Sequence, residues 1–245
     1  MNSISILALY IFFSFSGSQS AGDKMEICRE GCFHANEVKF DFSKPWFGIF
    51  RMGTSDDYEI RKVHPYVMKC SDPIFDTETD TLTGREVMVE KDYGGALLLI
   101  GGIDLKGGGM EVAHIHDPRC LYPGDYIRLK LNDQDYTLMA AGSIEFDTSN
   151  HRIIPYIRNY KVMLIQNMDD HAEVQDIIFF DRLYASEEVQ PAVFFAGDID
   201  RDGGLDLIYN LSDHYNMSNL TLFLSSAAAD GQLVKQVANW KTTGC

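Results

Sequence analysis

Long apolar runs are scarce in this chain of 245 residues. The one extended uncharged stretch, Ile4–Phe15, is too short to cross a bilayer, which takes about 20 residues in a helix. No segment keeps a helical period of apolar residues over three turns. We therefore expect no transmembrane segment and no coiled coil.

Basic side chains are also few. The chain has 21 Lys and Arg against 36 Asp and Glu, a formal net charge of -15 and an isoelectric point near 4.7. A chain of this charge repels phosphate backbones, so we expect no nucleic-acid partner. The same excess of carboxylates tolerates bound cations.

Signatures of common enzymes are missing. The sequence contains no Gly-x-Ser-x-Gly elbow and no His-Glu-x-x-His motif. Gly107–Gly109 is not followed by the Lys-Ser or Lys-Thr of a phosphate loop, so a turn is expected there. No enzyme activity is therefore predicted from a motif.

The first residues resemble a secretion signal. Ile4–Phe15 is followed by small residues at Ser18 and Ser20, which suit cleavage before Ala21, although no Lys or Arg precedes the apolar run. A buried N-terminal strand is the alternative. We expect residues 1–20 to be a signal peptide and residues 21–245 to form a single secreted or periplasmic domain.

Five cysteines would then enter an oxidising compartment, where disulfides persist. Cys28 with Cys32, and Cys70 with Cys120, are the pairs that spacing favours; Cys245 would stay free or join the N-terminal pair. Spacing alone does not determine the connectivity. A zinc site from Cys28, Cys32 and His34 is an alternative without the second half of a zinc motif.

Period-two patterns and short apolar runs predict a mainly β fold of antiparallel sheets, in a sandwich or barrel-like arrangement. Gly, Pro and Asn-Asp turn signals separate these segments. Alternating segments are Tyr126–Leu131, Tyr160–Ile165 and Leu220–Leu224. Continuous apolar runs are Trp46–Phe50, Ala96–Ile100 and Val193–Ala196. Ile177–Phe180 also fits a strand better than a helix.

The segment from Asp198 to Asp206 is the most informative part of the chain. Its carboxylates converge if the chain wraps around one small, hard cation, while Gly203 permits the sharp turn and the Gly204 carbonyl adds an oxygen. All-oxygen ligation favours Ca²⁺ over Zn²⁺. The expected ligands occupy relative positions 1, 3, 5, 7 and 9, namely Asp198, Asp200, Asp202, Gly204 and Asp206.

The flanks distinguish this loop from an EF-hand. Tyr209 stands where an EF-hand needs a bidentate acid, and both flanks are strand-like, so the loop is expected to be a calcium-binding hairpin. Residues 194–211 resemble an FG-GAP or VCBS repeat, the calcium-loop unit of integrin α-subunit propellers and of many secreted bacterial proteins. Those families string several repeats together, whereas this chain has one clear copy, so a propeller is not expected.

Two functions follow as hypotheses. The first is a calcium-binding β module, structural or binding a protein or a glycan, in which Ca²⁺ stabilises the fold. The alternative is a metal-dependent hydrolase that uses an open calcium site or His114 and His116, which would share one face of a strand. A third ligand would have to come from a distant residue such as His64, His151 or His171.

Overall fold

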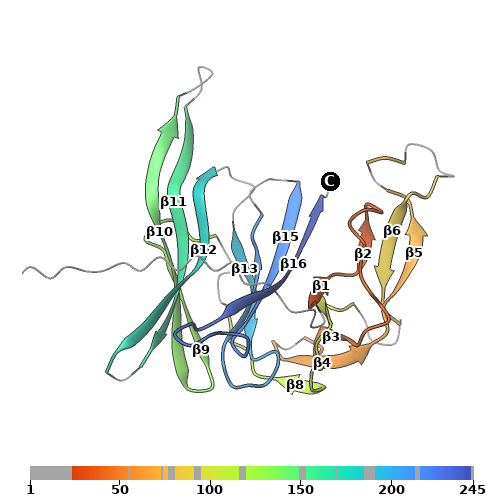
Figure 1. Ribbon diagram of the computed structural model, residues 1–245, viewed down its shortest axis with the longest axis horizontal. Coiled ribbons are helices and arrows are strands. Elements are labelled where there is room, and N and C mark those ends of the chain that lie inside the picture. Colours follow the sequence, from red (N-terminus) through yellow and green to blue (C-terminus); the bar gives the residue numbers. More distant parts are fainter. Residues whose placement is uncertain are drawn as a thin grey trace, which may run out of the picture.

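The computed structural model contains strands and no helix in the residues that it describes (Figure 1). Within these residues, no segment forms a helix that could cross a membrane. The signal peptide predicted for residues 1–20 lies outside them. The described ranges are 24–54, 56–72, 74–76, 81–90, 95–115, 120–148, 153–168, 170–184, 191–212 and 216–243.

The strands form four antiparallel sheets, which confirms the prediction of a mainly β fold. The first sheet has the order β1 (Glu26–Cys28), β7 (Leu98–Gly101), β3 (Trp46–Arg51), β4 (Tyr58–Val63) and β8 (Gly108–Met110). The second has the order β12 (Ala172–Tyr184), β11 (Ile154–Asn167), β10 (Gln134–Asp147) and β9 (Tyr126–Leu131). The third has the order β13 (Ala192–Gly197), β14 (Asp206–Asn210), β15 (Met217–Leu224) and β16 (Lys235–Thr243). The fourth comprises β2 (Gly31–Phe33), β6 (Gly84–Met88) and β5 (Tyr66–Cys70).

The β13–β16 sheet is the middle of three layers, with the β9–β12 sheet on one side and the β1–β8 part on the other (Figure 1). Its two faces contribute to separate cores. Ile208 and Leu222 pack with Trp46 and other residues of the first sheet. Leu207 and Phe223, their neighbours in the chain, pack with the β9–β12 sheet. The middle sheet is therefore apolar on both faces.

This layering explains the two sequence patterns. In β14 the first four residues are all buried, as expected of a strand covered on both faces. In β9 buried and exposed residues alternate strictly, because only one face of the outer sheet meets the core. The β9–β10 hairpin turns at Asn132 and Asp133, whose φ values of 47° and 63° suit a two-residue turn.

The cysteine pairing differs from both pairs that spacing favoured. Cys32 on β2 forms a disulfide with Cys70 on β5, and strand β6 lies between the two. Cys28 and Cys120 are free, and Cys245 lies outside the described residues. The disulfide also rules out Cys32 as a zinc ligand beside Cys28 and His34. The sheet, rather than proximity in sequence, brings the two sulfurs together.

The expectation of a simple turn at Gly107–Gly109 is also wrong. Gly108 begins strand β8, which pairs with the start of β4. The segment that follows β8 bridges to the middle sheet through Val112 and Gly197. These contacts bring the β8 segment to the end of β13, where the acidic loop begins.

Candidate metal centre

The acidic loop, defined here as residues 198–206, connects β13 to β14. Gly197 pairs with Asp206 at its base, so the loop closes an antiparallel hairpin of the middle sheet. The expectation of strands on both flanks is therefore confirmed. Gly203 has a φ of 89°, a conformation that a side chain disfavours. The sharp turn at this position thus depends on glycine.

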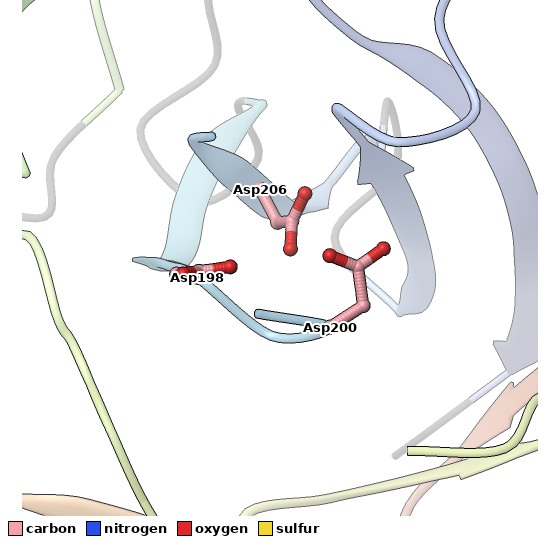
Figure 2. Close-up of side chains that lie close together, drawn as sticks. All are labelled: Asp198, Asp200 and Asp206. Atoms are coloured by element: carbon pink, nitrogen blue, oxygen red, sulfur yellow. The ribbon is translucent and has the colours of Figure 1, made fainter. Parts of the chain in front are cut away.

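Three carboxylates meet inside the loop. Asp198, Asp200 and Asp206 each offer an oxygen, and these oxygens lie within 4.8 Å of one another. Figure 2 shows the three side chains pointing toward a common space from the loop and from the first residue of β14. Oxygen donors at this separation can surround a single cation.

Asp198 and Asp206 are both buried, with 7% and 0% of their surfaces exposed. Asp206 accepts hydrogen bonds from the backbone amides of Ile199 and Ser225, each at 2.8 Å. Asp198 Oδ2 accepts one from the Gly203 amide at 3.1 Å, but Asp198 Oδ1 is buried without a partner. A buried, unpartnered carboxylate oxygen is costly unless a cation or proton meets it.

Asp202 is not a member of this group of three. Its Oδ1 accepts the Gly204 amide at 2.7 Å, and its two oxygens lie 2.9 and 3.0 Å from Ser225 Oγ. Gly204 sits against the same serine, since a Cβ there would come within 2.6 Å of Ser225 Oγ. The structure thus places the predicted ligands Asp202 and Gly204 beside Ser225, outside the group of three.

Two hydroxyl groups near the carboxylates were missed by the sequence reasoning. Ser225 Oγ also lies 2.9 Å from Asp206 Oδ1, and Ser226 Oγ hydrogen-bonds to Asp200 Oδ2. Both serines follow β15, which pairs with β14 directly beside the acidic loop. Their position in a Ser-Ser pair at the end of an apolar strand was the only available signal.

The surroundings of the loop oppose ionisation of its buried acids. Burial raises the pKa of Asp206 to about 7, and the negative charge of Asp200 adds to this, against the hydrogen bonds from Ser225. Burial also raises the pKa of Asp198, and Asp202 and Asp200 reinforce the effect. Without a cation, the ionised form of this cluster is disfavoured.

The loop is held to both neighbouring layers. Arg201 has a φ of 64° and donates from Nη2 to the carbonyls of Gly107 and Gly109, at 3.0 and 2.7 Å. On the other side, Asn132 Nδ2 donates to the Gly203 carbonyl at 3.4 Å, from the β9–β10 turn. The position of the acidic loop is therefore coupled to that of both outer sheets.

The histidine alternative has less support in the structure. His114 is exposed and lies outside any strand, and His116 and His151 lie outside the described residues. His64 and His171 are exposed as well. Across the described ranges, the acidic loop is the only place where three or more candidate ligands gather.

Comparisons with models of known protein families, with curated proteins and with solved structures give no match. The resemblance of residues 194–211 to FG-GAP and VCBS loops therefore remains a prediction from the sequence.

Proposed function

We propose that the protein is a secreted or periplasmic calcium-binding β module, in which Ca²⁺ bound to the acidic loop stabilises the folded chain. The observation that carries the proposal is the unpartnered, buried Oδ1 of Asp198 beside the carboxylates of Asp200 and Asp206. A bound cation would meet that oxygen and remove the repulsion among the three acids.

The donor set favours calcium among the common cations. The converging donors are carboxylate oxygens, and no His or Cys takes part in the group. Zn²⁺ prefers nitrogen and sulfur ligands, whereas Ca²⁺ accepts six to eight oxygens in a flexible arrangement. Asp198, Asp200 and Asp206 would supply the central ligands. A modest change beside Ser225 would add Asp202 and the Gly204 carbonyl.

The bound ion would stabilise the whole fold. Its loop contacts the β8 segment through Arg201 and the β9–β10 turn through Asn132. If the dissociation constant is near 10 μM and calcium near 1 mM, binding to the folded state alone stabilises it by about 2.7 kcal/mol. This is a substantial part of the stability of a typical domain.

A thermal melt of the purified protein in EGTA, in about 1 mM Ca²⁺ and in about 1 mM Mg²⁺ tests the proposal. We expect calcium to raise the melting temperature by several degrees and magnesium to raise it less, because Mg²⁺ requires stricter geometry and keeps its water. Equal melting temperatures in EGTA and calcium would contradict the proposal. Metal analysis that finds zinc instead of calcium would do so as well.

A further inference from the structure

A second site candidate adjoins the acidic loop, between the β9–β12 sheet and the middle sheet. A half-open cavity of about 260 Å³ lies there between the two layers. Tyr136, Gln166 and Glu173 stand directly opposite one another on β10, β11 and β12, so their side chains leave the same face of the sheet. They form one wall of the cavity.

The opposite wall comes from the middle layer. It includes Gly203 and Gly204 of the acidic loop, Ser225 after β15, and Gln232 in the loop before β16. Buried Leu164 and Leu205 and half-buried Leu233 also line the cavity, so its lining combines apolar with polar side chains. Such a mixture suits a ligand with an apolar ring face and a polar edge.

The polar groups are suited to neutral hydroxyls. Gln134, Gln166 and Gln232 each offer an amide that both donates and accepts, and Gln166 Nε2 already donates to Gln134 Oε1 at 3.3 Å. No Lys or Arg lines the cavity among the described residues, and Glu173 would repel an anion. Gln232 Oε1 also accepts a hydrogen bond from the Ala229 amide at 3.3 Å. A purely apolar ligand would leave the remaining donors and acceptors of these amides without partners, which is unfavourable.

We infer that this cavity between the β10–β12 wall and the acidic loop binds a single neutral sugar ring. A sugar carries paired hydroxyls that both donate and accept, and its C–H face can lie on the leucines. Cavities that enclose drug-sized ligands measure about 300–1,000 Å³, so a volume of 260 Å³ suits a smaller molecule of this kind. The inference does not require the cation, although the cavity shares Gly203, Gly204 and Ser225 with the metal site.

The test is saturation-transfer difference NMR on the whole protein with glucose, galactose, mannose and N-acetylglucosamine, in calcium and in EGTA. At least one sugar is expected to bind, with a dissociation constant on the order of 1 mM for so small a ligand. Gln166→Ala is expected to weaken that binding about fivefold or more, the effect of one lost hydrogen bond. Gln236→Ala is the matched control, because Gln236 is exposed on β16 and does not line the cavity.

Sugar binding in both buffers supports the inference. Sugar binding in calcium but not in EGTA also supports it, and indicates that the calcium-bound acidic loop forms part of the cavity wall. No saturation transfer to any of the four sugars in either buffer overturns it, and so does binding that Gln166→Ala leaves unchanged. If Gln166→Ala does not fold, Glu173→Ala at the exposed edge of the same wall replaces it. The calcium melt is a separate readout, so failure of the sugar site leaves the proposed calcium site standing.

Discussion

Two buried aspartates, Asp72 beside the small β2–β6–β5 sheet and Asp206 in the acidic loop, have opposite electrostatic surroundings. Both side chains are almost fully buried, and each carboxylate accepts hydrogen bonds from two backbone amides. Asp72 Oδ2 also lies 2.5 Å from His34 Nδ1, whereas Asp206 lies close to the carboxylates of Asp198 and Asp200.

The pKa values follow these surroundings. Burial alone would raise the pKa of Asp72, but the hydrogen bonds from His34, Ile74 and Phe75 outweigh it, and the pKa lies below its usual value. Burial raises the pKa of Asp206 to about 7, since Asp200 adds repulsion. A carboxylate with a partner inside the fold is thus stable when ionised, whereas the acidic loop depends on a proton or a cation from solution.

The largest expected effect tests whether the disulfide stabilises the fold independently of the calcium response. Replacing Cys32 and Cys70 together by Ser opens a loop closed over 38 residues and is expected to cost about 4 kcal/mol of unfolding free energy. The calcium-induced rise in melting temperature should stay as in the wild type, because the disulfide lies in the β2–β6–β5 sheet and the acidic loop belongs to the middle sheet. Denaturant unfolding measures the free energy, and thermal melts in EGTA and in calcium measure the calcium response; a lost calcium response would contradict this expectation.

Asp206→Ala is expected to remove the calcium response itself. The loss amounts to about 2.7 kcal/mol if calcium stands at 100 times the dissociation constant. Thermal melts in EGTA and calcium measure it, with Asp230→Ala as the matched control at an exposed aspartate outside the group of three. A full calcium response in Asp206→Ala would show that the ion binds elsewhere.

His34→Ala should weaken the fold without changing its response to calcium. The substitution leaves the buried Asp72 with backbone amides alone and removes the ring contact with Phe75, whose centroid lies 5.0 Å away. We expect the melting temperature to fall by several degrees in both EGTA and calcium. His171→Ala, at an exposed histidine that pairs with exposed Asp170, is the control and should change little.

The smallest expected effect is a difference in pH dependence. Because the folded pKa of Asp206 exceeds its usual value, the metal-free fold holds a proton that the unfolded chain releases, and stability falls as pH rises toward 7. Asp72, whose pKa is lowered, loses its contribution only in acid, below the usual range of an aspartate. The calcium-induced rise in melting temperature should therefore grow between about pH 5 and about pH 8. Melts across this range measure it, and a response independent of pH would contradict the assignment.

The sequence predicted the strands and the acidic loop because both depend on local patterns. Alternation in β9 and the continuous apolar residues of β13 follow directly from which faces are covered. The spacing of the aspartates likewise brings Asp198, Asp200 and Asp206 together within nine residues.

The remaining features depend on pairing between distant segments. Ser225 reaches Asp206 only because β15 pairs beside β14, 19 residues further along the chain. Cys32 meets Cys70 through the order of three strands, which spacing does not encode. Asp202 lies outside the group of three, and its carboxylate accepts hydrogen bonds from Ser225 Oγ and the Gly204 amide.

The middle position of the β13–β16 sheet also dictates when the chain can fold. Of the described strands, those of this sheet are the last to be synthesised, yet they cover the inner faces of both outer layers. Trp240 on β16 donates to the carbonyl of Glu37, 203 residues earlier in the chain. Until those strands emerge, two apolar surfaces remain open to self-association, and a chaperone that shields nascent chains would have most to protect in this interval.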